Sequence, residues 1–161
     1  MSNGSLYTHI QNNIATVQFY HPASNSFPSE LLERLATVFN ELSINNEVRV
    51  IILKSEKDKA FCAGASFDEL VAITNFEEGK QFFLGFANVI NAMRKCSKLI
   101  IGRIQGKAVG GGVGLAAACD YCFATEQAAI KLSEFTIGIG PFVIAPAVER
   151  KIGVAALSEL T

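Results

Sequence analysis

Apolar and polar positions show two periodicities in the first half of the chain, one typical of β-strands and the other of α-helices. Alternation across residues 7–11 and 14–20 predicts an opening β-hairpin. Apolar residues at helical spacing predict helices over residues 28–40 and 76–95, and an uninterrupted apolar run at 48–53 predicts a buried strand between them. The expected core-facing side chains of the later helix are Phe83, Phe86, Ile90 and Met93.

The second half of the chain repeats this order of elements. Residues 99–104 predict a strand, after which a glycine-rich turn opens a helix that runs to about residue 118. Short strands are expected at 121–125 and 129–132, and a last helical pattern covers 154–160. Strand-strand-helix units therefore recur, and the expected fold class is α/β, in one domain of residues 1–161.

Three consecutive glycines, Gly110, Gly111 and Gly112, stand where an apolar strand gives way to a helix-forming alanine series. Glycine has no Cβ, so the backbone here is free to adopt unusual φ/ψ angles and to approach a neighbour closely. Amide groups at the start of a helix lack intrahelical partners and favour negative charge. The triplet alone predicts either an oxyanion site or close packing of helix against strand, and does not decide between them.

A second turn of small residues precedes this one in the chain. It contains Gly64, Ala65 and Ser66, and Ser66 is expected to cap a short helix over residues 67–73. Two amide N–H groups from separate turns, converging on one point, stabilise the charge that develops on a thioester or ester carbonyl oxygen in acyl chemistry. The pair of turns therefore predicts an oxyanion hole more strongly than either turn alone.

Composition and charge narrow the classes of function. The 161 residues include 14 basic and 15 acidic side chains, and this near-neutral balance argues against non-specific binding of nucleic acid or of an anionic membrane. The longest apolar stretch is interrupted by glycines and is too short to span a membrane. The N-terminus shows no signal-peptide pattern, so a cytoplasmic location is expected.

The sequence contains four cysteines, Cys62, Cys96, Cys119 and Cys122; Cys62 is interpreted as a packing residue, and Cys119 and Cys122 as ordinary buried thiols. Cys119 and Cys122 have C-x-x-C spacing, but no second pair and no nearby histidine completes a zinc site, so no metal is expected. The pair stands at the end of a predicted helix, whereas a thioredoxin-like motif stands at a helix start. Cys62 lies beside the first turn, but no histidine follows it to act as its base.

Several segments, in order over nearly the whole chain, resemble the enoyl-CoA hydratase/isomerase (crotonase) superfamily. They are residues 21–27, 61–65, 110–115 followed by Cys119 and Asp120, and 132–141. Residues 110–115, 139–146 and 150–153 are most similar to the methylglutaconyl-CoA hydratase branch of leucine breakdown. The resemblance implies that the β-β-α units coil into the right-handed ClpP/crotonase-like superhelix.

The resemblance also implies the site residues. Glu134 matches one of the family's two catalytic glutamates and is expected to exchange a proton with the substrate α-carbon or with a water. The position of the other glutamate holds Gly114, so a single carboxylate is expected. The expected oxyanion hole consists of the N–H groups of Ala65 and Gly111. Further expected substrate-binding residues are Ala23, Asn25, Ala63, Gly64, Ser66, Gly110, Gly112 and Gly114.

Asp68 and Glu69, at the start of the predicted short helix, are alternative acids. Acidic residues at this place also stabilise the helix dipole without any catalytic role, and that interpretation is favoured.

Two functions follow from the resemblance. One is an enzyme that hydrates or isomerises an unsaturated acyl-CoA, with decarboxylation also compatible with a single carboxylate; CoA is then a substrate carrier, and no nucleotide cofactor is implied. The other is a catalytically weak acyl-CoA-binding or assembly module of the same fold. Family members continue beyond the position of Thr161 with helices that cover the pocket and form trimers. A homotrimer or dimer of trimers is therefore expected for a full-length chain, and an exposed apolar face for this one.

Overall fold

Five strands form the larger sheet of this computed structural model, which describes residues 4–56 and 60–161. Residues 1–3 and 57–59 of the predicted domain lie outside the described residues. The strands are β1 (Ser5–Gln11), β2 (Ile14–Tyr20), β3 (Val50–Ser55), β5 (Leu99–Ile104) and β7 (Tyr121–Ala124). They follow the order β1-β2-β3-β5-β7, in which β1 is antiparallel to β2 and the other neighbours are parallel. The predicted opening hairpin is confirmed.

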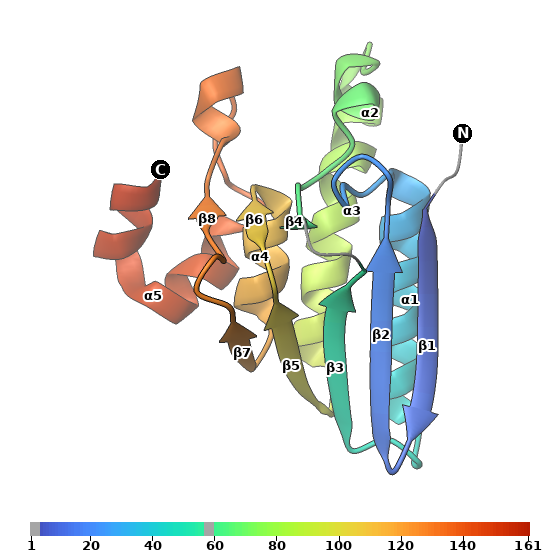
Figure 1. The fold of residues 1–161 in the computed structure, drawn as a ribbon. Helices are drawn as coiled ribbons and strands as arrows, with labels where there is room; N and C mark the ends of the chain where they lie inside the picture. Colours follow the sequence, from blue (N-terminus) through green and yellow to red (C-terminus); the bar gives the residue numbers. More distant parts are fainter. Residues whose placement is uncertain (1–3, 57–59) are drawn as a thin grey trace.

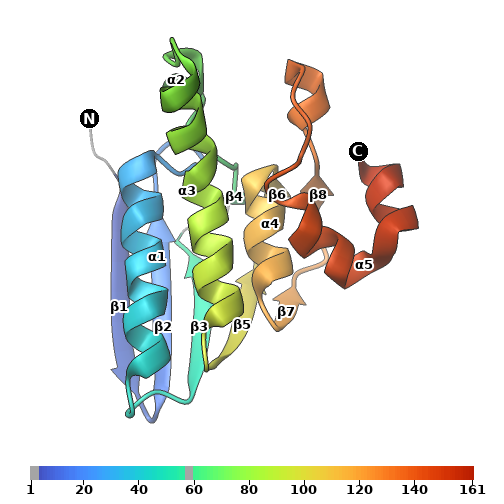
Figure 2. The ribbon, with the colours of Figure 1, turned by 180° about the vertical axis from the view of Figure 1, so that it is seen from behind.

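Helices α1 (Ser29–Ile44), α3 (Phe76–Lys95) and α4 (Gly111–Ala118) cover one face of this sheet, and α5 (Ala145–Leu160) packs beside α4. The short α2 (Phe67–Val71) and the 3-10 helix η1 (Glu134–Ile137) lie between them in the chain. Figure 2 shows α1, α3 and α4 side by side in front of the sheet, with α5 next to α4. In both views α2 and η1 lie beyond the ends of the long strands.

Three short strands form a second sheet, which is parallel throughout and has the order β4-β6-β8. They are β4 (Ala60–Cys62), β6 (Lys107–Val109) and β8 (Ile130–Lys131), and each comes next in the chain after a strand of the larger sheet. Each of these strand pairs then leads to a helix, as β3-β4-α3, β5-β6-α4 and β7-β8-α5 (Figure 1). The repeated β-β-α units confirm the predicted α/β fold class.

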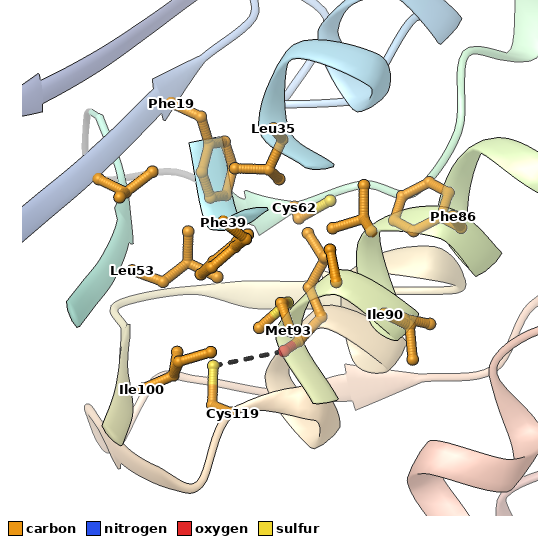
Figure 3. Packing of buried hydrophobic residues seen from close by; sticks show 14 of the residues in the cluster. Phe19, Leu35, Phe39, Leu53, Cys62, Phe86, Ile90, Met93, Ile100 and Cys119 are labelled. Carbon is orange, nitrogen blue, oxygen red and sulfur yellow. Dashed lines mark hydrogen bonds between the residues drawn. The ribbon is translucent and has the colours of Figure 1, made fainter. Parts of the chain in front are cut away.

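The core lies between the larger sheet and the helices that cover it (Figure 3). Phe19 of β2 and Leu53 of β3 are fully buried there against Leu35 and Phe39 of α1. The burial of β3 alternates, so the apolar run predicted as a wholly buried strand is fully covered on one face only. Helix packing of this kind explains why apolar positions on α1 and α3 recur three and four residues apart.

Helices α1 and α5 differ most from their predicted bounds, and α2 ends two residues before its predicted end. Helix α1 continues to Ile44, and Pro28 is its N-cap with extended backbone angles. Helix α5 begins at Ala145, whereas the pattern predicted a helix only from residue 154. Pro146 stands in its first turn, where proline needs no amide hydrogen, and Gly153 with a φ of 81° bends the helix in the middle. Proline and glycine therefore concealed the first half of α5 in the sequence pattern.

The predicted core position of Phe83 is wrong. Its ring is 38% exposed, whereas Phe86, Ile90 and Met93 on the same helix are buried. Figure 2 shows the reason, since the first turns of α3 extend past the larger sheet, so no sheet lies behind them. The spacing of apolar residues does not reveal where a helix extends beyond the sheet that would bury them.

Large apolar side chains are exposed along the last third of the chain, among them Tyr121, Phe123, Phe135, Phe142 and Val154. Tyr121 and Phe123 share one face of the edge strand β7, with ring centroids 5.1 Å apart. Neighbouring exposed apolar groups such as Tyr121 and Phe123 are typical of surfaces that contact another protein surface. Within the described part of the chain, no helix combines the length and the apolar character needed to cross a bilayer.

Candidate active site

The first turn of small residues runs from β4 into α2. Phe27 N–H donates to Gly64 O at 2.8 Å, and Ser66 N–H donates to Phe27 O at 2.9 Å. Neighbouring peptide groups of an extended segment point to opposite sides, so the Ala65 N–H points away from Phe27. It donates no hydrogen bond to another described residue. Gly64 has a φ of 89°, which a side chain would disfavour.

The second turn runs from β6 into α4. Gly110 is the N-cap of α4 with a φ of 52°, and its N–H donates to Lys131 O at 2.9 Å. Gly111 is the first residue of α4, where an N–H has no intrahelical acceptor. As with Ala65, its N–H donates to no other described residue.

The two turns lie directly against each other. A Cβ added to Gly64 would lie 3.4 Å from the Gly111 nitrogen, and a Cβ added to Gly112 would clash with Cys62 O. These contacts leave no room for side chains, so close packing is one reason for the glycines. The glycine triplet predicted either close packing or an oxyanion site. In the structure the close packing of the two turns also places the amides of Ala65 and Gly111 near each other.

Both turns line one pocket of about 190 Å³. Its backbone side consists of Ala63, Gly64, Ala65, Gly110 and Gly111. Its apolar wall consists of Phe67, Leu70, Phe82, Phe83, Phe86, Ile137, Ile139, Pro141, Val143 and Ile144, and Ser133, Glu134 and Gly140 complete the lining. Among the described residues that line the pocket, Glu134 alone carries an ionisable side chain.

Glu134 begins η1, and its carboxylate lies over the second turn. A Cβ added to Gly110 would lie 3.2 Å from Glu134 Oε1, so this glycine leaves space for the carboxylate. Glu134 Oε2 is buried and has no hydrogen-bond partner among the described residues. Buried polar atoms in folded proteins are nearly always paired, so an unpaired carboxylate oxygen in a pocket is suited to a partner that enters the pocket.

An apolar side chain fills the position beside Gly114. A Cβ added to Gly114 would lie 2.5 Å from Ile144 Cγ2 and 3.1 Å from Ile90 Cδ1. Ile144 is itself buried and lines the pocket. The missing second carboxylate is therefore not replaced by another acid in this part of the pocket, because an isoleucine occupies the space.

The structure divides the predicted site residues into two groups. Ala63, Gly64, Ala65, Gly110, Gly111 and Glu134 line the pocket, and Ala23, Asn25, Ser66, Gly112 and Gly114 are not part of its lining. Asn25 is buried and holds its own turn: its Oδ1 accepts from His21 N–H at 2.9 Å and its Nδ2 donates to Ala60 O at 2.8 Å. Ala23 is exposed on that turn.

Ser66 has the predicted capping role. Its hydroxyl accepts from Glu69 N–H at 3.3 Å at the start of α2, which ends at Val71. Glu69 in turn reaches the start of α1, where Ser29 N–H and Ser29 Oγ donate to its carboxylate at 2.9 and 2.6 Å. Asp68 is exposed, and neither acid lines the pocket with Glu134. The favoured interpretation of both acids as helix-start residues agrees with these contacts.

Sequence reasoning missed the apolar wall of the pocket. Phe82 and Phe83 come from the part of α3 that extends beyond the larger sheet, and Phe67 and Leu70 come from α2. Ile137 is the last residue of η1, and the lining residues from Ile139 to Ile144 belong to the segment between η1 and α5. The adjacent Phe82 and Phe83 were the available signal, because two neighbouring aromatic residues of a helix do not both face one core stripe.

Cys62 is packed behind the first turn. It is fully buried, and burial raises the pKa of its thiol to about 12, so it stays protonated at neutral pH. This agrees with its interpretation as a packing residue. Cys122 is only half-buried, which corrects its interpretation as a buried thiol, and Cys96 is half-buried as well. Within residues 4–56 and 60–161, no group of three or more His, Cys, Asp or Glu side chains is placed to hold a metal ion.

The β-β-α superhelix and this pocket define a crotonase-fold protein. An enoyl-CoA hydratase from Mycobacterium smegmatis of known structure superposes with a TM-score of 0.90 at 27% identity, over 96% of this chain and 61% of that one. The chain belongs to the enoyl-CoA hydratase/isomerase family, whose family model matches residues 9–161.

Curated relatives support the same assignment. Human mitochondrial methylglutaconyl-CoA hydratase is 35% identical over 117 residues, which are 73% of this chain and 34% of that protein. The short-chain-enoyl-CoA hydratase of Clostridium acetobutylicum is 31% identical over 129 residues, which are 80% of this chain and 49% of that protein. The branch that the sequence resembles is thus represented among its relatives, and the chain spans about half or less of the length of these two proteins.

Proposed function

We propose that this chain binds the thioester of an unsaturated acyl-CoA and moves a proton on it with a single carboxylate. The observation that carries the proposal is Oε2 of Glu134, which has no partner among the described residues and lies in a mainly apolar pocket, beside two turns whose amides donate to no other described residue. An acyl chain suits the apolar wall, and a thioester carbonyl oxygen suits the amides.

The proposed oxyanion hole consists of the N–H groups of Ala65 and Gly111. Both residues line the pocket, and neither amide donates to another described residue. Removing a proton from the α- or γ-carbon of the acyl group places negative charge on the thioester oxygen. Two fixed N–H groups stabilise that charge without reorganising, which lowers the barrier to forming the enolate.

Glu134 is the proposed acid and base. A carboxylate in hydrogen-bond reach of the acyl group takes a proton from one carbon and returns it to another, which isomerises the double bond. It also serves hydration, when it takes a proton from a water that attacks the β-carbon. Ile144 fills the place beside Gly114, so either reaction relies on Glu134 as the ionisable group of the pocket. Among the substrates of this class, methylglutaconyl-CoA remains the particular acyl-CoA suggested by the resemblance.

Measuring binding and turnover separately tests this function. The chain is titrated with saturated butyryl-CoA by calorimetry, and its turnover of 2-butenoyl-CoA and 3-hexenoyl-CoA is followed by chromatography of the products. Binding with turnover above a protein-free control supports the enzyme. Binding without turnover supports the alternative, an acyl-CoA-binding or assembly module. Absence of butyryl-CoA binding together with absence of turnover of both unsaturated thioesters contradicts both.

We propose assembly as a homotrimer or dimer of trimers for a full-length chain, in the cytoplasm and without a cofactor beyond the CoA of the substrate. The support for assembly is the exposed apolar set that includes Tyr121, Phe123 and Phe142. Light scattering on the chain measures its mass in solution.

The packing of Ile144 against Gly114 predicts a specific pattern of stability. Gly114→Ala is expected to lower the free energy of unfolding by about 1–3 kcal/mol, because the new Cβ overpacks the side chain of Ile144. In an Ile144→Ala background the same change is expected to cost less, since Cγ2 is gone. Urea unfolding of the two single variants and the double variant measures the coupling. Equal costs in both backgrounds would contradict this packing.

A further inference from the structure

Two cysteines meet where α4 ends and β7 begins. Cys119 is the C-cap of α4, and Cys122 is in β7. Cys119 Sγ lies 3.4 Å from Leu115 O and Cys122 Sγ lies 3.3 Å from Ala116 O, so both sulfurs lie over the last turn of the same helix. Figure 3 shows the Cys119 sulfur directed at that carbonyl oxygen.

The two sulfurs both lie beside Gly102 of β5. Gly102 pairs with Cys122 in the parallel register of β5 and β7. A Cβ added to Gly102 would lie 2.9 Å from Cys122 Sγ and 3.1 Å from Cys119 Sγ. Glycine within a strand marks a close approach of other groups, and here the groups that occupy the missing side chain's space are the two thiols.

The two thiols differ in charge and exposure. Cys119 is fully buried, and the contact with Cys122 and burial raise its pKa well above the usual range. The hydrogen bond from Cys119 lowers the pKa of Cys122 to about 7, and the cation of Lys151 adds to this while partial burial opposes it. Lys151 of α5 is held nearby, since its Nζ donates to Asp120 O at 2.8 Å. The half-buried Cys122 is therefore the thiol that reacts, and Cys119 is its neighbour.

We propose that Cys119 and Cys122 form a reversible oxidation site, at which hydrogen peroxide converts the two thiols into a disulfide. In the first step the Cys122 thiolate attacks one peroxide oxygen. The O–O bond breaks, a sulfenic acid forms on Cys122, and the leaving hydroxide takes up a proton to become water.

In the second step the Cys119 sulfur attacks the sulfur of the sulfenic acid. The S–O bond breaks, the S–S bond forms, and the thiol proton of Cys119 leaves with the hydroxide as a second water. Two thiols have then lost two electrons to one peroxide. A dithiol reductant reverses the change by thiol-disulfide exchange.

The other cysteines serve as internal controls. Cys62 is fully buried behind the first turn, with a pKa of about 12. Cys96 is half-buried at the C-cap of α3. Cys96 is about as exposed as Cys122 but has no thiol beside it among the described residues. It is therefore the matched control for a cysteine that cannot form a disulfide within the chain.

Peroxide treatment followed by mass mapping tests the site. The reduced chain is treated with hydrogen peroxide, alkylated under denaturing conditions and digested with trypsin, which releases residues 108–131 as one peptide with both cysteines. This peptide is expected to lack two hydrogens and to carry no alkyl groups, and a dithiol reductant is expected to restore both thiols. Cys62 is expected to remain a thiol under the same treatment.

Variants test the assigned roles. In Cys119→Ala, the thiolate fraction of Cys122 at pH 7 is expected to fall by about tenfold as its pKa returns toward that of a free thiol, and its alkylation in the native chain is expected to slow. In Cys122→Ser, Cys119 is expected to stay reduced under peroxide. A peptide 108–131 that keeps both thiols while Cys96 becomes oxidised would overturn the proposal. So would oxidation of Cys122 to the same end product in the presence and absence of Cys119. Acyl-CoA turnover is not measured in these experiments, so their outcome is independent of the proposed function.

Discussion

Glu134→Gln is expected to lower the rate of enoyl-CoA turnover by about 10²–10⁴-fold, the contribution of general acid–base catalysis. Glutamine keeps the shape of the side chain but does not transfer a proton at neutral pH. Glu134 is the ionisable side chain of the pocket lining, so no other described residue there takes over its role. Steady-state kinetics with 2-butenoyl-CoA and 3-hexenoyl-CoA measures the loss, on the form of the protein that shows turnover. Calorimetry with butyryl-CoA is expected to show that binding persists.

Asp68→Asn is the matched control for this change. It removes an exposed carboxylate that lies outside the pocket lining, so turnover is expected to stay near that of the unchanged protein. Glu69→Gln is expected to act first on stability, because Glu69 accepts hydrogen bonds from Ser29 at the start of α1. If Glu134→Gln left turnover intact and Asp68→Asn abolished it, the acid would belong to α2, and the assignment of Glu134 would be wrong.

Gly111→Pro is expected to lower kcat by about 10²–10³-fold relative to Gly111→Ala, because proline has no N–H and alanine keeps it. Position 111 is the first residue of α4, where proline is well tolerated and its missing N–H breaks no helix bond. Both variants add a Cβ that would lie 2.5 Å from the Phe86 ring, so both share the cost of moving that ring. The ratio of their kcat values therefore reports the replacement of the N–H by the ring carbon of proline at that nitrogen.

Far-ultraviolet circular dichroism shows whether the two Gly111 variants are folded. Should the shared Cβ unfold both, the same pair is compared in a Phe86→Leu background, which shortens the side chain in the way. Equal kcat values for the alanine and proline variants would exclude the Gly111 amide from the oxyanion hole, even if Glu134 proves essential.

Local rules predicted most elements of the fold. The bounds of α3 follow from its spacing and from the cap at Asn75, whose side chain accepts from Glu78 N–H at 3.0 Å. The cap at Ser66 follows in the same way. The first half of α5 escaped prediction because Pro146 and Gly153 interrupt the pattern, although proline in the first turn is compatible with a helix.

The candidate site was only partly predictable. The turns at Gly64 and Gly110 are recognisable in sequence because small residues between a strand and a helix are a local feature. Asn25, an expected substrate-binding residue, has a side chain that hydrogen-bonds the backbone at His21 and Ala60, and this role was not predicted. Whether a polar side chain faces a ligand or its own backbone depends on partners far away in the chain, and no local pattern contains them.

The sequence by itself determined the family, the strands of the larger sheet and the helices α1 to α4, the two glycine turns and the absence of a carboxylate at Gly114, but it did not predict the short strands β4 and β6. These depend on residue type, spacing and backbone freedom, which are local properties. Only the tertiary structure decided which residues far apart in the chain contact one another. It placed Gly64 against Gly111, Ile144 in the space beside Gly114, and Phe83 on a pocket wall outside the core. It also brought the thiols of Cys119 and Cys122 against Gly102. Such contacts join residues from different β-β-α units, and their distances are set by how the sheets and helices pack, which no stretch of the chain encodes alone.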